Sequence, residues 1–135
     1  AKGYWYRGDS TNAERLLRIN LTESTLKPLS PEWKDSLFSL GSLLFEQGKH
    51  EAAISTLEEA VERYPEDRQA LQSRYMIGEA YRRWALEPLE LIQQARTASD
   101  REKNQQIVDE RLSKALEYFK AVRLDQSIQT TVALL

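Results

Sequence analysis

The stretch LFSLGSLLFEQGKHEAAISTLEEAVERYP, residues 37–65, decides the fold that we expect for this chain. The apolar and small residues of its first half recur every three or four positions and so lie along one stripe of a helix: Leu37, Leu40, Gly41 and Leu44. Gly41 leaves room in that stripe for a second helix to approach closely. Gly48 is expected to end the helix.

The second half of the stretch has the same helical periodicity. A helix that begins at Lys49 or His50 places five residues on one stripe: Ala53, Ile54, Leu57, Ala60 and Val61. Pro65 ends this helix, because proline disfavours the helical conformation in the residue before it. The stretch therefore predicts a pair of antiparallel helices.

The order of large, small and helix-breaking residues resembles the tetratricopeptide repeat. The matching elements are Leu37-x2-Leu40-Gly41-x2-Leu44, Ala53-x3-Leu57 and Pro65. Leu37, Leu44 and Leu57 stand where that pattern prefers aromatic residues. The resemblance implies an all-α fold, in which antiparallel helix pairs stack into a solenoid with a right-handed superhelix, and a function in protein binding.

A displacement of 40 residues maps the central repeat onto the amino-terminal part of the chain. It pairs Gly48 with Gly8, Ala53 with Ala13, Leu57 with Leu17 and Leu44 with Tyr4. Tyr4-Trp5-Tyr6-Arg7 is then the last turn of a truncated helix, and Thr11-Asn12-Ala13-Glu14 is a capping box for its partner. We therefore expect a fragment of a longer chain, whose first aromatic residues are packing residues without their cover.

The third repeat is longer than the others. Leu44 lies 9 residues before Ala53, whereas Tyr81, in the matching element Ile77-Gly78-x2-Tyr81, lies 34 residues before Ala115, a difference of 25. The added residues keep helical spacing, so they predict a long-armed helical hairpin. Pro88 predicts a kink or short break between Leu86 and Leu89, and Ser99-Asp100-Arg101-Glu102 reads as a capping box at the turn of the hairpin.

These patterns predict one domain over residues 1–135. Its parts are a truncated repeat with a connector at 1–29, the central repeat at 30–67, the expanded repeat at 68–126 and a tail or the start of a further helix at 127–135. The expected helices span residues 10–21, 31–47, 50–64, 69–97 and 100–124. Ser30-Pro31-Glu32 supplies a cap, a first-turn proline and a first-turn acid for the second of them.

Composition and charge exclude several classes of function. The net charge is −2 with 30% charged residues, and a nucleic-acid surface needs a concentrated basic patch. No apolar run approaches the roughly 18 residues that span a bilayer. The absence of cysteine suits the cytoplasm and the bacterial periplasm alike, so the compartment stays open. Repeats with long arms look like those of bacterial envelope assembly proteins, a likeness at the level of the fold.

The chain lacks the residues that an enzyme of this size needs. His50 is the only histidine, and the five glycines form no phosphate-binding loop. We expect no catalytic site, metal or cofactor, and we interpret His50 as an exposed turn residue. The paired acids Glu58-Glu59 and Asp109-Glu110 have the spacing of solvated helix faces. Asn20-Leu21-Thr22 fits the pattern of an N-glycosylation acceptor. This three-residue pattern is common by chance, so we do not interpret it as a modification site.

What remains is a binding surface on the first helix of each pair. The stripe beside the packing stripe faces the inside of a solenoid, where extended peptides bind. The candidate residues are Asp35, Phe38, Ser42 and Phe45 in the central repeat and Gln72, Tyr75, Glu79 and Arg82 in the next. Tetratricopeptide domains that bind the acidic tails of chaperones have lysine and asparagine where Phe38 and Ser42 stand, so that mode is not expected. In the alternative, Phe38 and Tyr75 pack against the neighbouring repeat.

Three functions stay open at this point. The first is a scaffold or adaptor that holds a protein or peptide partner. The second is a regulatory or oligomerising segment of a larger enzyme whose catalytic domain lies outside these residues, and the third is a structural spacer. We also expect self-association through the terminal repeats, where Tyr4, Trp5 and Leu17 at one end and Val132 to Leu135 at the other lack cover.

Overall fold

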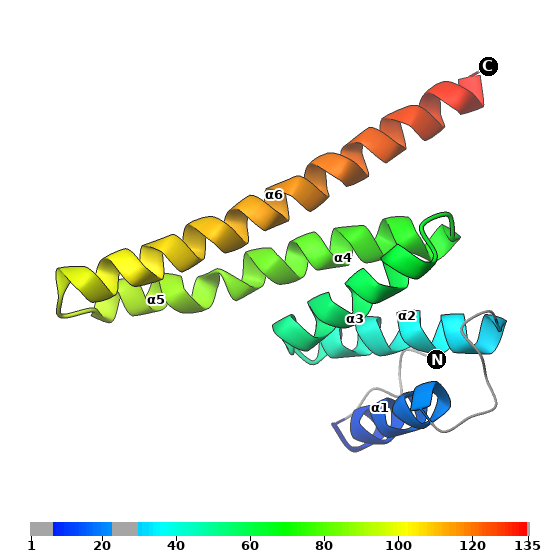
Figure 1. Ribbon diagram of the computed structural model, residues 1–135, viewed down its shortest axis with the longest axis horizontal. Coiled ribbons are helices and arrows are strands. Elements are labelled where there is room, and N and C mark those ends of the chain that lie inside the picture. Colours follow the sequence, from blue (N-terminus) through cyan, green and yellow to red (C-terminus); the bar gives the residue numbers. More distant parts are fainter. Residues whose placement is uncertain (1–6, 23–29, 135) are drawn as a thin grey trace. The chain divides into compact units, whose positions relative to one another are not determined.

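The structure is a computed structural model that describes residues 7–22 and 30–134, with side chains described for 11–22 and 30–124. Its helices are α1 (Arg7–Thr22), α2 (Pro31–Glu46), α3 (His50–Arg63), α4 (Arg68–Trp84), α5 (Leu86–Gln94) and α6 (Ala98–Leu134) (Figure 1). No strand occurs within the described ranges, so the all-α prediction is confirmed. The chain divides into a first unit that ends at Ser73 and a second that begins at Arg74, within α4.

The two ends of α2 form as predicted. Ser30 has an extended backbone, and its hydroxyl oxygen accepts a hydrogen bond from the Trp33 amide at 3.2 Å, while Pro31 fills the first turn. At the other end Gly48 adopts φ 74°, and the Lys49 amide donates to the Leu44 carbonyl at 3.0 Å. Only a residue without a side chain adopts this backbone at little cost, so Gly48 ends the helix.

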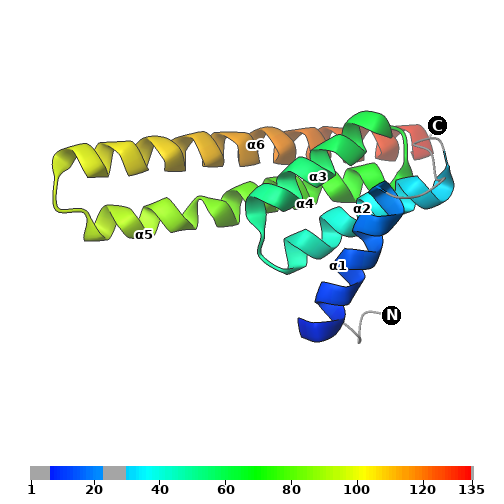
Figure 2. The ribbon, with the colours of Figure 1, turned by 60° about the horizontal axis from the view of Figure 1, so that its bottom comes forward.

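The antiparallel pair α2 and α3 forms the core of the first unit (Figure 2). A Cβ atom added to Gly41 would lie 2.6 Å from Leu57 Cγ, so the two helices meet where only glycine fits. The residues of both predicted packing stripes that are buried are Leu37, Leu40, Gly41, Leu44, Ala53, Ile54, Leu57 and Ala60. The close approach predicted at Gly41 is therefore confirmed.

Helix α1 begins earlier than its capping pattern predicted. The predicted cap, Thr11, lies inside the helix, whose first residue is Arg7. Residues 9–12 are four successive residues of types that cap helices, so the pattern alone does not select one of them. Leu17 and Leu21 of α1 pack on a cluster in which Leu40 and Leu44 of α2 are buried.

The break between α4 and α5 lies at Ala85, one residue before the predicted interval. Pro88 has no amide hydrogen for the Trp84 carbonyl four residues earlier, and its ring crowds that carbonyl. The helical pattern resumes when the Leu89 amide donates to the Ala85 carbonyl at 3.3 Å. Arg111 of α6 donates from Nη1 to the Trp84 carbonyl at 2.9 Å and so replaces the missing partner.

Helix α6 departs from its predicted bounds at both ends. Its cap is Thr97, whose hydroxyl accepts a hydrogen bond from the Asp100 amide at 3.1 Å, and Ser99 lies inside the helix. Thr97 and Ser99 are both cap-forming residues, and the pattern selected the wrong one. The helix extends to Leu134 instead of ending at Leu124. Helices α5 and α6 lie side by side as the predicted long-armed hairpin (Figures 1 and 2).

Aromatic residues join α4 to α6 within the second unit. The rings of Tyr81 and Tyr118 stack with centroids 6.2 Å apart, and those of Tyr75 and Phe119 are 5.9 Å apart. Gly78 lies opposite them, since an added Cβ would meet Phe119 Cε1 at 2.8 Å. The second glycine of the repeated element thus permits close packing, as the first does in the central repeat.

Candidate functional site

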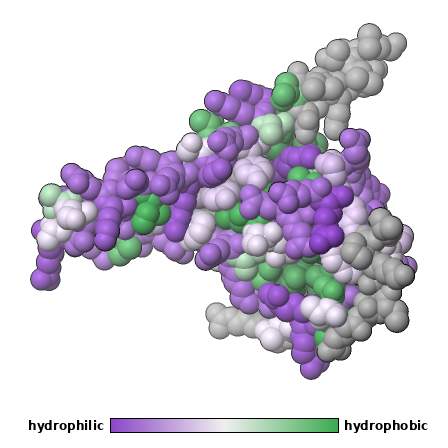
Figure 3. Space-filling view, in the orientation of Figure 1, coloured by the Kyte–Doolittle hydropathy of each residue, from purple (hydrophilic) through white to green (hydrophobic). Residues whose placement is uncertain are grey.

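The first unit holds a groove between α1 and α2 with a volume of about 450 Å³. Its lining comes from α1 (Ala13, Leu16, Leu17), from α2 (Phe38, Ser39, Ser42, Leu43, Glu46) and from Gln69 at the start of α4. Apolar surface gathers over α2 in the space-filling view (Figure 3). Two of the eight predicted candidates, Phe38 and Ser42, therefore lie at this groove.

Phe38 is a core residue. Only 2% of its surface is exposed, and its ring lies 6.1 Å from that of Tyr64, in a cluster with Trp33 and Ala60. The Phe38 side chain forms part of the floor of the groove. Its burial supports the alternative in which Phe38 packs within the fold.

The other candidates of the first unit lie closer to solvent. Asp35 is exposed, and its Oδ1 accepts a hydrogen bond from Gln69 Nε2 at 3.1 Å. Ser42 is half-buried in the groove, and Phe45 is half-buried against the cluster that contains Leu40 and Leu44. Gln72 on α4 is exposed.

The remaining three candidates belong to the second unit. Tyr75 is 45% exposed and touches Phe119 with one side of its ring. Arg82 is exposed and forms an ion pair with the half-buried Glu79, to which Arg83 Nε also lies within 3.6 Å. Tyr75 and Arg82 are thus both accessible to a partner.

Helix α1 contributes to the groove although the candidate stripe did not include it. The candidate stripe lies only on the first helix of each pair, whereas Leu16 on α1, a second helix, is 57% exposed at the groove. Leu16 and Leu17 are adjacent leucines, and one packing stripe needs only one of them. The second leucine was therefore the feature of the sequence that could have indicated a contribution from α1 to the groove.

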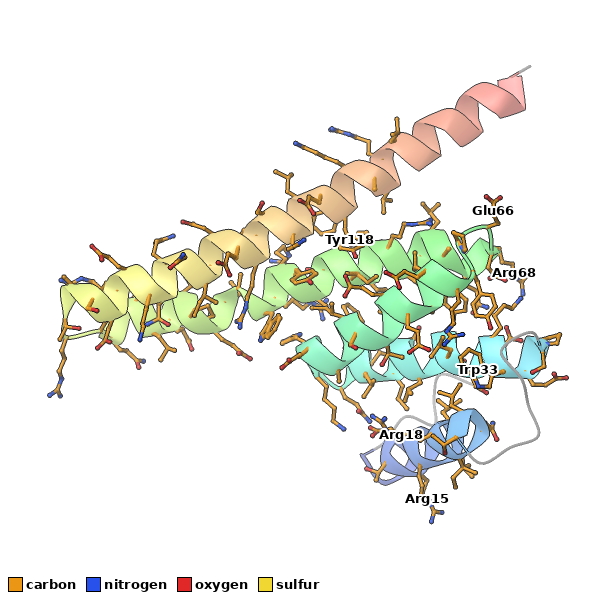
Figure 4. The ribbon with its side chains drawn as sticks, in the orientation of Figure 1. Arg15, Arg18, Trp33, Glu66, Arg68 and Tyr118 are labelled. Carbon is orange, nitrogen blue, oxygen red and sulfur yellow. The ribbon has the colours of Figure 1, made fainter. Side chains whose placement is uncertain are left out.

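One ion pair links α1 to the α2–α3 turn, and a second lies within α1. Glu14 accepts hydrogen bonds from Lys49 Nζ at 2.9 Å and from Arg18 Nε at 3.0 Å. The Lys49 hydrogen bond is the main cause that lowers the pKa of Glu14 below its ordinary value. Figure 4 shows Arg18 on the α2 side of α1 and Arg15 on the opposite side. One wall of the groove is thereby tied to the central repeat.

A second ion pair positions the start of α4. Lys34 Nζ lies 2.6 Å from Asp67 Oδ2, and Asp67 Oδ1 also accepts from the Gln69 amide at 2.9 Å. The hydrogen bond from Lys34, followed by the one from Gln69, lowers the pKa of Asp67, and the bond to Asp67 raises the pKa of Lys34. These contacts place Gln69 at the groove.

No metal-binding cluster of three or more histidine or carboxylate residues occurs within the described part of the chain. His50 is half-buried at the first residue of α3, so its interpretation as an exposed turn residue was wrong. Among the described helices none has the length and apolar character to cross a membrane. Of the residues named for self-association, Tyr4, Trp5 and the side chains of residues 132–135 lie outside the described residues.

Comparison with known families decides the classification. A family model described as "Tetratricopeptide repeat" matches residues 1–68 and residues 38–99. The chain belongs to the tetratricopeptide repeat family. Neither the comparison with curated proteins nor that with solved structures gave a match. Tetratricopeptide repeats form helical solenoids and generally mediate protein–protein interactions.

In tetratricopeptide terms, α2 and α3 are the first and second helices of the central repeat. By the same displacement of 40 residues, α1 is the second helix of the preceding repeat. The matched residues stop at 99, so almost all of α6 lies outside them. The groove of the first unit is therefore built from the part that the family pattern covers.

Proposed function

We propose that this tetratricopeptide chain is a non-catalytic scaffold that binds a partner protein or peptide through the first-helix residues of each unit and, in the first unit, through the groove between α1 and α2. The observation that carries the proposal is the apolar groove beside Ser42, open to solvent and about 450 Å³ in volume. Pockets of this size that combine apolar lining with a few polar groups are typical of binding sites. Here Ser39, Ser42 and Gln69 are the neutral polar groups.

The accessible stripe residues have the side-chain types that dominate binding energy at interfaces. Tyr75 and Arg82 are exposed, and tyrosine and arginine are enriched among hot spots. Phe38 supports the site from beneath, so its replacement would disturb the core as well as binding. The informative substitutions are therefore Tyr75→Ala and Arg82→Ala.

Site-specific cross-linking tests the proposal. A photoreactive amino acid at Ser42 should capture a partner from the cell, and the same amino acid at the exposed Ser55 of α3 should not. With that partner purified, Tyr75→Ala and Arg82→Ala should each weaken binding by more than about 1 kcal/mol, or roughly fivefold. If both variants keep the full affinity, the stripe is not the binding surface.

A second candidate function rests on the long-armed hairpin. Leucines on both of its helices are exposed: Leu86, Leu89 and Leu91 on α5 and Leu112, Leu116 and Leu124 on α6. Such residues support the proposal that this segment is the regulatory or oligomerising arm of a larger enzyme. Its tests are the full-length sequence, which would contain a catalytic domain, and the oligomeric state of the chain.

A further inference from the structure

The second unit holds a pocket of about 760 Å³ between α4 and α6. Tyr81 and Trp84 of α4 form one side of it, and the rest of the lining comes from α6 within residues 106–114. None of the candidate stripe residues lies here, and this part of α6 is outside the residues that match the family model. The pocket is therefore a feature of the long-armed hairpin and not of the repeat pattern.

Arg111 is a half-buried cation in this pocket. Its guanidinium lies 3.6 Å from the centre of the Trp84 ring, and its Nη1 donates to the Trp84 carbonyl at 2.9 Å. A guanidinium has five N–H donors, and among the described residues no carboxylate forms an ion pair with Arg111. A stacked guanidinium that keeps free donors is suited to bind an oxygen ligand from another molecule.

The sequence around Arg111 explains why α6 supplies no acid. In α1 and in α3, an arginine pairs with the glutamate four residues before it. The residues three and four before Arg111 are Val108 and Ile107, and those three and four after it are Lys114 and Ala115. These four positions are the neighbours of Arg111 on the helix surface. They provide apolar side chains and a second cation instead of a carboxylate.

The pocket thus combines two cations with an apolar surface. Lys114 lies 3.7 Å from Glu117, and both side chains are exposed, so this ion pair is weak and Lys114 can pair with a ligand. Arg111 lies directly on the Trp84 ring. A ligand that contacts both groups must therefore carry its negative charge next to an apolar group. A carboxylate matches the planar fork of a guanidinium.

Two acids limit the charge of the ligand. Asp109 and Glu110 also line the pocket, and both are exposed. Their carboxylates repel a phosphate dianion or a run of acidic residues more strongly than they repel one carboxylate. The pocket therefore favours a ligand with a single negative charge.

We propose that this pocket binds the carboxyl terminus of a partner protein whose last residue is apolar. The terminal carboxylate pairs with Arg111 and Lys114, and the last side chain packs on Trp84 and Ile107. Only at its last residue does a protein chain carry a carboxylate and an apolar side chain on the same carbon atom. The inference goes beyond the proposed function, because this site is separate from both the stripe and the groove.

A synthetic peptide tests the proposal on the intact chain. The probe is the hexapeptide acetyl-Gly-Ser-Gly-Ser-Ala-Leu, whose carboxyl terminus is its only charge, and the control is its carboxamide. In isothermal titration calorimetry the carboxamide should bind at least about tenfold more weakly than the free acid, because it lacks the charge-assisted hydrogen bonds. In a ¹H–¹⁵N spectrum the free acid should shift the indole signal of Trp84, assigned with Trp84→Phe, and leave that of Trp33 in place.

Substitutions in the chain locate the peptide. Lys114→Glu should weaken binding of the free acid about tenfold or more, since it reverses a charge at the carboxylate. Lys120→Glu, the same change at an exposed residue of α6 that does not line the pocket, should leave the affinity unchanged. Arg111→Met should abolish binding but also removes contacts within the fold. The Lys114 side chain is 57% exposed, so its variant should keep the melting temperature and test the site alone.

Three results would overturn the inference. The first is equal affinity for the free acid and the carboxamide, or no binding of either. The second is full affinity in the Lys114→Glu variant, which would place the peptide elsewhere. The third comes from octanoate, a carboxylate without a peptide chain. If octanoate shifts the Trp84 signal and the peptide does not, the pocket takes a small free acid and not the end of a protein.

Discussion

A single glycine determines how closely the helices of the central repeat approach. Leu57 has no exposed surface and lies where a side chain at Gly41 would have to go. Gly41→Leu should therefore lower the free energy of unfolding by about 1 to 3 kcal/mol through overpacking. Urea denaturation followed by circular dichroism measures this change.

The matched control is Ser55→Leu, which adds the same side chain at an exposed position of α3. It should change the free energy of unfolding by less than about 0.5 kcal/mol. Equal stability of the Gly41→Leu variant and the unchanged chain would show that α2 and α3 do not pack at this point.

Arg111 compensates for the amide that Pro88 lacks. Its guanidinium donates to the Trp84 carbonyl at 2.9 Å and lies 3.6 Å from the centre of the Trp84 ring. Arg111→Met should cost about 1 to 3 kcal/mol, because it removes a charged hydrogen bond and a cation–π contact. The cost should shrink in a Pro88→Ala background, where an amide at residue 88 can bond to the carbonyl.

A double-mutant cycle on thermal or urea unfolding measures this coupling. Lys114→Met serves as the control, since it removes a cation from α6 at a side chain that is 57% exposed. If Arg111→Met costs the same with and without Pro88, the hydrogen bond does not replace the missing amide. That result would mean that the proline ring alone causes the break at Ala85.

At the scale of helices, the pair Lys34 and Asp67 links α2 to the turn before α4. The pKa of Asp67 is lowered in the folded chain, so the ionised form contributes stability above the ordinary value of 3.8. This contribution is lost as the pH falls through the lower folded value. Asp67→Asn should therefore reduce the melting temperature at pH 7, and the difference from the unchanged chain should vanish in stronger acid.

Melting curves between pH 7 and pH 2 test this expectation. Glu66→Gln, an exposed change at the neighbouring residue, controls for the loss of one negative charge. A difference for Asp67→Asn that persists at the lowest pH would mean that the residue acts through packing and not through its charge. A second acid with a lowered pKa, Glu14, should lose its contribution over the same acid range.

The helix pair was predictable because its signals agree. The stripe containing Gly41, the helix-ending Gly48 and the Ser30 cap all indicate the same two helices, and each is found in place. Where several residues compete, as Thr97 and Ser99 do, local pattern does not select the helix start. The site at Arg111 was beyond prediction, since residues 27 apart meet only once the hairpin has formed.

The candidate stripe was predictable only as a helix face. Spacing places Phe38 and Ser42 on one side of α2, but whether each is buried depends on what the neighbouring helix supplies. Tyr64 follows α3 and covers Phe38, and Leu16 on α1 forms the wall opposite Ser42. Such contacts are set by tertiary packing, which a single helix face does not encode.

At the scale of the whole molecule, the chain combines a groove in its first unit with exposed leucines in its second. Leu112 and Leu116 are four residues apart and so are neighbours on one face of α6, and they are 44% and 52% exposed. Full burial of one leucine side chain contributes about 1.5 to 3 kcal/mol of favourable free energy, so burial of this face in a contact would stabilise association. A second copy of the chain exposes the same two leucines, so two copies can bury them against each other.

We therefore expect the chain to self-associate through α6 at high concentration. Multi-angle light scattering should show a mass above 15.6 kDa that rises with concentration. Leu112→Glu with Leu116→Glu should restore the monomer, because two carboxylates would have to be desolvated in the contact. Gln106→Glu with Ser113→Glu adds the same charge to exposed positions of α6 and should leave association intact. A chain that stays monomeric at every concentration would refute association through this face.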